Sequence, residues 1–478
     1  MTDRLTAIRR TLDDHGQAHV LAFYDQLSAS QQNALLDQLQ AIDFNALDAW
    51  VRDYVKTAPE AKLPPKLEPA PYYRRPDDPE HAAQYDAAHY RGIGEDLLRS
   101  GKVAAFTVAG GQGTRLGWNG PKGTYPATPV TGKPLFRVFA EQIHAAQVKY
   151  GVTIPWYIMT SPINDAATRA FITDNNCFGL TRKNIFMFPQ GVMPTLDAET
   201  GKLLLAEKHE IAVHPDGHGG AIKALRTSGA IEDMSARGIE HISYFQIDNP
   251  LARAVDPLFL GLHTAAPDSS ADLSSKMVAK AYPEEKVGVF CKVDGKVAVV
   301  EYSDLPQELN DSRDESGKLR FNAGSIAIHL FGVKFVERLT ADADRFALPF
   351  HRAVKKAAYI DPATGERIEP EEPNAVKLET FVFDALPLAE NSIVLETTRE
   401  EFAPIKNASG VDSPTTSHEL QTERNARWLE QLGVKVPRTG EGKVNATIEI
   451  SPLTALEPED FPATELPQAI ASGSRISL

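Results

Sequence analysis

Apolar residues in the first part of the chain repeat at the interval of a helix rather than of a strand. The clearest repeat places three leucines on one helical face: Leu35, Leu36 and Leu39. Ser28, followed three residues later by Gln31, matches a capping box, in which each side chain accepts a hydrogen bond from the backbone of the other residue. We therefore predict an amphipathic helical region over residues 1–57.

The pattern changes twice after this region. Residues 59–79 are rich in proline and charge, which favours an extended linker, and residues 81–100 again have helical character. From there the chain alternates helical stretches with short apolar runs of strand type, at 102–108, 156–159, 185–188 and 241–247. This alternation predicts an α/β fold with a mixed, mostly parallel sheet covered by helices.

Two segments indicate further β-structure. Residues 287–302 alternate apolar and polar positions on both sides of Asp294-Gly295, a pair that favours the tight turn of a β-hairpin. The last residues lose helical periodicity and gain proline, threonine and serine, which predicts a small β-rich C-terminal domain. The expected division is a helical N-terminal region, a central α/β domain and this C-terminal domain, covering residues 1–98, 99–402 and 403–478.

Composition narrows the classes of partner. The formal charge of −14 argues against nucleic acid and against an anionic membrane surface, both of which need a basic field. A small anionic substrate stays open, because its site needs only a few local cations and backbone donors. The chain has two cysteines, Cys177 and Cys291, which allow no disulfide framework beyond one bridge and show no spacing of a metal motif. Without a signal-like or spanning apolar run, we expect a cytoplasmic protein, either a monomer or a homodimer.

A glycine-rich loop, AGGQGTRLGWNGPKG (residues 109–123), directly follows the first strand-type run. Its closely spaced glycines, which let backbone N–H groups approach a phosphate or a base edge, are Gly110, Gly111 and Gly113. Arg115 and Lys122 add cations suited to phosphate oxygens, so the loop fits a triphosphate. A dinucleotide-binding turn would need an acidic residue about 20 positions further on, and Glu141 lies too far away. A Walker-type loop is excluded because no Gly-Lys-Ser/Thr closes it.

GGQGTRLG followed by PKG resembles the signature loop of the eukaryotic-type UDP-sugar pyrophosphorylases, and it is most similar to the UDP-N-acetylglucosamine pyrophosphorylases. The resemblance covers residues 102–407 and extends more loosely to the N-terminal helices. It implies a Rossmann-like nucleotidyltransferase core that joins UTP and a sugar 1-phosphate to give a UDP-sugar and pyrophosphate. It also implies Mg²⁺ as the cofactor, with Mn²⁺ as an alternative.

Two motifs would bind the uridine and the sugar. In FPQGVMPTLD, the amide of Gln190 can both donate and accept, as the O4/N3 edge of uracil requires, and the resemblance assigns it to the base together with Gly110 and Gly111. In HPDGHGGAIKAL, a glycine-rich turn opens a helix, and the resemblance places Gly217 and His218 against uridine and sugar. The N-acetylglucosamine enzymes carry asparagine at the position of His218, which is more similar to the glucose-type and broad-specificity enzymes.

A third motif, ISYFQIDNPLAR, supplies a candidate metal ligand. Asp248 comes just after a strand, where α/β sheets place their ligands, and a carboxylate there can hold Mg²⁺ that bridges phosphate oxygens. The resemblance assigns Asp248 to the metal and places Asn249 beside it as a substrate-binding residue. A helix cap at either residue is the structural alternative.

The remaining candidates rest on the resemblance alone. Sugar contacts are implied for Gly288, Glu301 and Asn322. Phe381 and Phe383, expected on one face of a strand, would surround an acetamido group, although two aromatics at this spacing usually belong to a core. Lys406 would reach the sugar phosphate, beside Lys122 at the reacting phosphates and Arg115 at the departing pyrophosphate.

Three other functions are alternatives to a UDP-N-acetylglucosamine pyrophosphorylase. A UDP-glucose or broad-specificity pyrophosphorylase is favoured by His218, whereas Phe381, Phe383 and Gly220 favour the N-acetylglucosamine activity. A dinucleotide-dependent oxidoreductase lacks the acidic residue that it needs. A non-catalytic UDP-sugar sensor would have no use for several charged residues at the reacting phosphorus. The sugar 1-phosphate is itself an anionic nucleophile, so the expected work is positioning and charge stabilisation rather than general-base catalysis.

Overall fold

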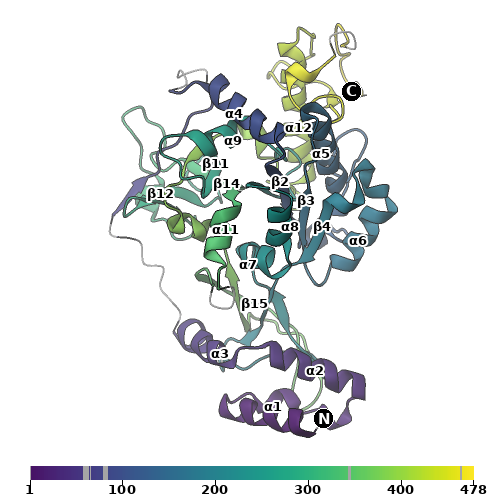
Figure 1. Ribbon diagram of the computed structural model, residues 1–478, viewed down its shortest axis with the longest axis vertical. Coiled ribbons are helices and arrows are strands. Elements are labelled where there is room, and N and C mark those ends of the chain that lie inside the picture. Colours follow the sequence, from purple (N-terminus) through teal and green to yellow (C-terminus); the bar gives the residue numbers. More distant parts are fainter. Residues whose placement is uncertain (1, 58–63, 65, 79–83, 343–345, 463–465) are drawn as a thin grey trace. The chain divides into compact units, whose positions relative to one another are not determined.

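The computed structural model describes the whole chain except residues 1, 58–63, 65, 79–83, 343–345 and 463–465 (Figure 1). It forms two compact units. The first unit comprises residues 1–62, 191–220 and 348–382, and the second comprises 63–190, 221–347 and 383–478. The predicted division into 1–98, 99–402 and 403–478 stays a prediction, and the two units cut across it. The predicted linker, 59–79, lies partly outside the described residues.

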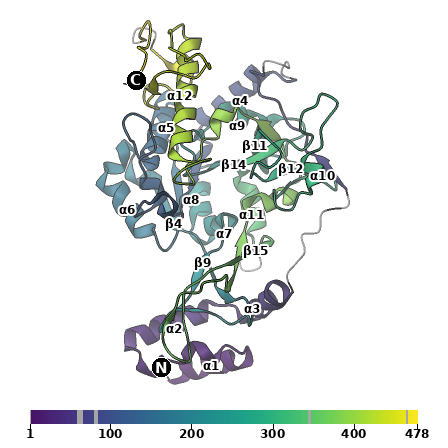
Figure 2. The ribbon, with the colours of Figure 1, turned by 180° about the vertical axis from the view of Figure 1, so that it is seen from behind.

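The second unit is built on a large sheet with the strand order β1-β12-β14-β10-β2-β3-β4. Its central strands run parallel to one another: β2 (Val103–Val108), β3 (Trp156–Thr160), β4 (Ile185–Pro189) and β10 (His241–Gln246). Helices such as α5 (Leu135–Tyr150) and α6 (Asp165–Asp174) connect these strands (Figures 1 and 2). Because both faces of the sheet are covered, the strands are continuous apolar runs. The predicted α/β fold with a mixed, mostly parallel sheet is confirmed.

The strand order places a crevice between β2 and β10. From β2 the chain moves outward through β3 to β4, whereas β10 lies on the opposite side of β2. Ligands of open α/β sheets bind where the strand order reverses, beyond the carboxyl ends of the strands. Gln246 is paired with Val108 at these ends, so the loops that follow β2 and β10 begin side by side.

Two glycines allow α4 (Ala87–Arg99) to pack directly on α9 (Pro257–Ala265), which lie together in Figure 1. A Cβ atom on Gly94 would stand 1.8 Å from the carbonyl oxygen of Pro257. A Cβ atom on Gly261 would stand 1.8 Å from the carbonyl oxygen of Tyr90. The two helix backbones therefore touch at positions where no other residue fits. Helix α4 lies within the predicted helical segment 81–100, of which residues 81–83 are outside the described part.

The predicted β-hairpin is confirmed. Strands β12 (Val289–Val293) and β13 (Lys296–Val300) pair in antiparallel register around Asp294 and Gly295. Both turn residues have positive φ, 48° and 83°, as the mirror-image turn of a tight hairpin requires. On its other side, β12 pairs with β1 (Leu67–Pro69) and with β14 (Ala323–Gly332).

The prediction of a β-rich C-terminal domain is wrong. Residues 403–478 contain the 18-residue helix α12 (Pro414–Gln431), accompanied by the short strands β20 (Thr447–Glu449) and β21 (Arg475–Ser477). The helix lacked an apolar signal because polar residues lie along its buried face, at Ser417, Gln421 and Asn425. These side chains reach backbone carbonyl groups: Gln421 donates to Ala127 at 2.8 Å and Asn425 to Ile448 at 2.9 Å.

The first unit joins the N-terminal helices to a small sheet, β15-β18-β6. Its elements are α1 (Thr2–Asp14), α2 (Ala29–Ala41), α3 (Phe44–Trp50), β6 (Leu196–Asp197), β15 (Phe350–Lys355) and β18 (Ala375–Thr380). Leu35 and Leu39 pack with Val376 and Leu378 in one core. The capping box from Ser28 to Gln31 is present. The predicted amphipathic helices of the N-terminal region are therefore confirmed.

Candidate active site

The glycine-rich loop after β2 is held in place by the turn between β3 and α6. The side-chain amide of Asn164 donates to the carbonyl oxygens of Ala109 at 2.9 Å and Gly111 at 3.2 Å. The hydroxyl of Ser161 donates to the carbonyl oxygen of Gly110 at 2.9 Å. Sequence reasoning missed Ser161 and Asn164, because the carbonyl groups they hold lie about fifty residues away along the chain. These bonds use carbonyl oxygens of the loop and none of its N–H groups.

Gln190 lies directly against this loop. It follows β4 and is buried, and its backbone N–H donates to the carbonyl oxygen of Thr160 at 2.8 Å. A Cβ atom on Gly110 would stand 2.5 Å from Oε1 of Gln190, so a larger residue there would displace the Gln190 amide. The structure thus brings together two of the residues predicted to bind uridine. Their role in reading the base stays a prediction.

A lysine and an aspartate from the two neighbouring loops meet at the crevice. Nζ of Lys122, at the end of the glycine loop, lies 3.4 Å from Oδ2 of Asp248, which follows β10. Their side chains are only 17% and 12% exposed, so solvent screens this ion pair less than it screens a surface pair. The backbone N–H of Lys122 donates to the carbonyl oxygen of Gly111 at 3.0 Å, which closes the loop. A cation and a carboxylate therefore converge where the strand order reverses.

Asn249 fixes a second segment beside Asp248. Its amide donates to the carbonyl oxygen of Glu401 at 2.7 Å and accepts from the N–H of Ala403 at 3.1 Å. The N–H of Ile405 donates to the carbonyl oxygen of Asp248 at 2.9 Å. These bonds place the segment that carries Lys406 against the loop that carries Asp248. They give Asn249 a positioning role, and its predicted substrate contact stays a prediction.

Lys406 itself is 37% exposed, with Nζ 3.5 Å from Oδ2 of Asp412 and 5.2 Å from the centre of the Phe402 ring. Arg115 is exposed on a short helical turn, η4 (Thr114–Leu116). Both cations therefore remain reachable by a phosphate from solvent, as their predicted roles require.

A buried lysine that sequence reasoning missed supports the same segment. Lys276, on β11 (Leu273–Ala279), has a side chain only 1% exposed. Its Nζ lies 2.6 Å from both Asp256 and Glu401. A lysine that directly precedes the apolar run 277–279 is the signal that could have revealed this group, because a cation buried in such a strand must find carboxylates inside the fold.

The predicted sugar-binding group is brought together in part. A Cβ atom on Gly288 would stand 3.3 Å from Oε1 of Glu301, so these two residues are neighbours at one end of the β12–β13 hairpin. Asn322, just before β14, donates its amide to the hydroxyl of Tyr72 at 3.5 Å. No sugar contact is tested by these bonds, and the three assignments stay predictions.

In the first unit, His218 belongs to a stack of three rings. Its ring stacks on Phe381 with centroids 5.2 Å apart and planes at 10°, and His351 stacks on Phe381 at 4.0 Å and 23°. The N–H of Val382 donates to Nδ1 of His218 at 3.1 Å, which places the proton of the neutral ring on Nε2. Burial, with the charge of His351, lowers the pKa of His218 to about 4. At neutral pH, His218 is therefore a neutral hydrogen-bond donor through Nε2.

The turn that carries His218 packs tightly against the end of β18. Gly217 has φ of +85°, and a Cβ atom there would stand 2.4 Å from the carbonyl oxygen of Thr380. Thr380 also pairs through its backbone with Asp216 and Gly219, at 2.8 Å in each case. The expected helix, α7 (Gly220–Thr227), opens directly after this turn.

The prediction that Phe381 and Phe383 share one strand face is wrong. β18 ends at Thr380, whose backbone is occupied by the glycine turn, and the 3₁₀ helix η8 (Val382–Leu388) begins two residues later. Period-two alternation therefore does not extend over these residues. Phe381 belongs to the first unit, whereas Phe383 is buried in the second.

Two searches of the described residues bear on cofactors and membranes. They contain no group of three or more His, Cys, Asp and Glu side chains that could hold a metal ion. None of the helices built from those residues is long and apolar enough to span a bilayer.

Comparison with known proteins gives one consistent result. Residues 75–427 match the family model described as UTP–glucose-1-phosphate uridylyltransferase. The UDP-N-acetylhexosamine pyrophosphorylase-like protein 1 of Xenopus tropicalis is 35% identical, over 94% of this chain and 91% of that protein. A probable UDP-N-acetylglucosamine pyrophosphorylase of Dictyostelium discoideum is 34% identical, over 96% and 95%.

Solved structures agree. The crystal structure of a putative UDP-N-acetylglucosamine pyrophosphorylase from Entamoeba histolytica superposes with a TM-score of 0.73, at 30% identity, over 86% of this chain and 99% of that one. The match extends beyond the glycine loop to nearly the entire chain. This protein belongs to the UTP–glucose-1-phosphate uridylyltransferase family.

Proposed function

We propose that the protein transfers a uridylyl group from UTP to N-acetylglucosamine 1-phosphate. In this reaction a phosphate oxygen of the sugar 1-phosphate attacks the α-phosphorus of UTP. The bond from that phosphorus to the β-phosphate oxygen breaks, and pyrophosphate leaves with the electron pair. The observation that carries the proposal is the meeting of Lys122 and Asp248, 3.4 Å apart, beside a glycine loop at the reversal of strand order.

The chemistry follows from where the charges lie. Two anions must be brought together, and negative charge grows on the oxygens around the transferred phosphorus. Lys122 supplies a positive charge at the C-terminal end of the glycine loop. Lys406 supplies a second positive charge from the segment that Asn249 holds. Because the loop carbonyls already bind Ser161 and Asn164, the loop does not have to reorganise when the nucleotide binds.

A divalent cation fits the position of Asp248. Mg²⁺ is commonly held by one or two carboxylates, together with substrate phosphates and water, so a single aspartate is sufficient on the protein side. In the structure the carboxylate of Asp248 already faces a cation, the ammonium group of Lys122, which supports its role in holding positive charge. When bound, the ion would neutralise phosphate charge. Asp248 would be its protein ligand.

The identity of the sugar rests on the relatives and on His218. The names of the relatives favour an N-acetylhexosamine 1-phosphate. One observation favours glucose or galactose 1-phosphate as a second candidate. A neutral His218, fixed by Val382 and stacked on Phe381, presents a single N–H donor. The side-chain amide of asparagine, which the N-acetylglucosamine enzymes carry at this position, would present donors and an acceptor.

Pyrophosphate release from purified protein with UTP and Mg²⁺ tests the proposal. The panel of acceptors would hold the 1-phosphates of glucose, galactose, N-acetylglucosamine and N-acetylgalactosamine. Turnover confined to the N-acetylhexosamines is the expected result. Preference for glucose or galactose would select the second candidate, and absence of release with any sugar would refute uridylyl transfer.

A further inference from the structure

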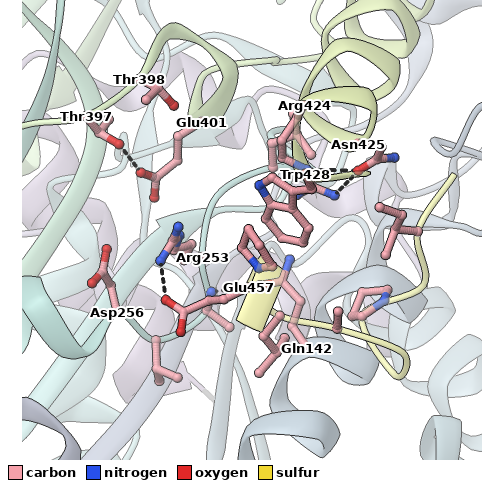
Figure 3. A pocket seen from close by; sticks show the side chains of 18 of the residues that line it. Gln142, Arg253, Asp256, Thr397, Thr398, Glu401, Arg424, Asn425, Trp428 and Glu457 are labelled. Atoms are coloured by element: carbon pink, nitrogen blue, oxygen red, sulfur yellow. Dashed lines mark hydrogen bonds and ion pairs between the residues drawn. The ribbon is translucent and has the colours of Figure 1, made fainter. Parts of the chain in front are cut away.

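A charged cavity of about 330 Å³ lies in the second unit, with all of its lining residues in that unit. Figure 3 shows side chains from the loop after β10, from α12 and from the segment around Glu457 arranged around it. We call it the arginine pocket, after Arg91, Arg253, Arg424 and Arg427 in its lining. Among the described residues, those that line it include none of the glycine loop, Lys122, Asp248 or Lys406. The pocket is therefore distinct from the candidate active site.

One wall of the arginine pocket gathers three cations around a single carboxylate. The carboxylate of Glu457 receives three cations: Arg91 at 2.8 Å, Lys149 at 3.1 Å and Arg253 at 3.0 Å. Burial alone would raise the pKa of Glu457, but Arg253 and Arg91 hold it below its ordinary value. The three cations share Glu457 as a direct partner, and Lys149 also reaches Asp460 at 2.6 Å. Against the effect of burial, the charges of Asp256 and Glu401 raise the pKa of Arg253 as well.

Arg424 adds a further cation on the facing helix. Two of its N–H groups donate to Oδ1 of Asn425, at 3.1 and 2.8 Å, and its guanidinium lies 4.6 Å from the centre of the Trp428 ring. Within the described part of the chain, Arg424 forms no ion pair with a carboxylate. Burial and the neighbouring charge of Arg253 lower the pKa of Arg424 to about 10. The charges of Glu400 and Glu401 act on Arg424 without forming an ion pair, so an anion bound directly to its guanidinium would stabilise it further.

We propose that the arginine pocket binds a small phosphate monoester, with Arg424 and Arg253 as its ligands. The planar fork of a guanidinium matches two phosphate oxygens at once, and each such bond is charge-assisted. The volume of the cavity is that of a site for a small organic ligand rather than for a lone ion, so the phosphate should carry an organic group.

The walls of the pocket connect it to the candidate active site. Leu251 and Arg253 come from the loop that carries Asp248, and Thr397 and Glu401 come from the segment that carries Lys406. A ligand that draws Arg253 away from Glu457 pulls on the loop of Asp248. Occupancy of the pocket therefore changes the rate of uridylyl transfer. This regulatory consequence rests on the proposed function, whereas binding does not.

Calorimetric titration with ribose 5-phosphate tests binding. Saturating UTP, without a sugar 1-phosphate acceptor, keeps the probe out of the nucleotide site. Arg424→Gln should weaken binding by about tenfold or more, since a charge-assisted pair is lost. The matched control is Lys443→Gln, which removes one exposed positive charge from the same C-terminal part of the chain and should leave binding unchanged. Equal binding by Arg424→Gln and the unaltered protein would overturn the proposal, and so would equal affinity for inorganic phosphate.

A measurement on the unaltered protein guards against misfolding of the variant. Phenylglyoxal modifies accessible arginines, and mass spectrometry would report the extent of modification at Arg424 with UTP present. Ribose 5-phosphate should protect Arg424, and modification that is unaffected by the ester would overturn the assignment. In the pyrophosphate assay, the ester should change the initial rate by about fivefold or more, and Arg424→Gln should abolish that response. If the protein releases no pyrophosphate at all, the proposed function is refuted. The titration and the protection experiment still decide whether the arginine pocket binds the ester.

Discussion

Lys276→Met should destabilise the second unit by about 3 kcal/mol at neutral pH. Methionine matches the length of the lysine side chain but leaves Asp256 and Glu401 buried without the cation that lies 2.6 Å from each. Breaking a buried pair in this way costs about 3–5 kcal/mol. The lower end applies because Asp256 keeps the N–H of Phe259, at 3.2 Å, and the nearby charge of Arg253.

The pH dependence separates loss of charge from loss of packing. Burial alone would raise the pKa of Asp256, but Lys276 and Arg253 hold it well below its ordinary value. A carboxylate with a lowered pKa in the folded state stabilises the fold above its unfolded pKa of about 3.9, and this contribution is lost as the pH falls through the folded pKa. In Lys276→Met that contribution is missing. Burial without the cation raises the folded pKa of Asp256 above its unfolded value, which destabilises the fold increasingly as the pH rises above about 4. The difference in stability should be full at pH 7 and should shrink toward pH 4, as the uncompensated carboxylates take up protons.

Urea denaturation followed by fluorescence would measure the free energy of unfolding of the variant and of the unaltered protein at pH 7 and at pH 4.5. Lys102→Met is the matched control, because Lys102 also lies 2.6 Å from a carboxylate, that of Glu240, but is 36% exposed. The control should lose less than about 1 kcal/mol. If Lys276→Met loses the same free energy at both pH values, the loss comes from packing and the electrostatic reasoning is refuted.

Four other outcomes can be measured directly. Lys122→Ala should lower kcat by about a hundredfold or more, with a much smaller change in UTP affinity by equilibrium binding; equal losses would make the lysine a binding residue only. His218→Asn should raise the ratio of kcat/KM for N-acetylglucosamine 1-phosphate over glucose 1-phosphate by about tenfold in the acceptor panel, and an unchanged ratio would remove this residue from sugar selection. Gly94→Ala should destabilise by about 2 kcal/mol or more in urea, because its methyl group meets Pro257, whereas Gly92→Ala on the same helix meets open space and should be neutral or stabilising. Chelation of divalent cations should stop pyrophosphate release and added Mg²⁺ or Mn²⁺ should restore it; release that persists in chelator would contradict the assignment of the cation.

Local signals predicted much of the fold. The capping box at Ser28 and the Asp294-Gly295 turn are contained within a few residues, and both form as expected. The apolar run 102–108 predicted a buried strand because a strand covered on both faces needs no alternation. The glycine loop that follows this strand could be recognised as a candidate site because its glycines, Arg115 and Lys122 lie within one short stretch.

What failed depended on partners far away in the chain. Helix α12 turns Ser417, Gln421 and Asn425 inward, so the hydrophobic pattern that marks a helix was absent. Its N-terminal signal, Ser413 followed by proline at the first helical position, indicates only where a helix can begin. The sequence pattern predicted a strand that continues through Phe381, but the strand ends at Thr380. The turn 216–219, distant in sequence, explains this end because it occupies the backbone of Thr380.

The residues of the candidate active site also fall into those that local sequence patterns predicted and those that they did not. Lys122 and Asp248 could be predicted because each lies in a loop that follows a strand, and strand ends gather at one edge of a parallel sheet. Ser161, Asn164 and Lys276 could not, because their function is to hold other segments rather than to face a ligand. Their partners are backbone carbonyl groups or buried carboxylates that no local pattern reveals.

The first unit is assembled from three separate stretches of chain, and this imposes an order on its synthesis. Its N-terminal helices leave the ribosome early, yet the strands of residues 348–382 that complete their core are made last. At about 5–20 residues per second, the interval between residue 62 and residue 382 is roughly 15–65 seconds. During that time Leu35, Leu36 and Leu39 lack the part of their native core that Ile360, Val376 and Leu378 supply. A nascent chain halted before residue 348 should therefore recruit chaperones through its first helices, however well the second unit has begun to fold.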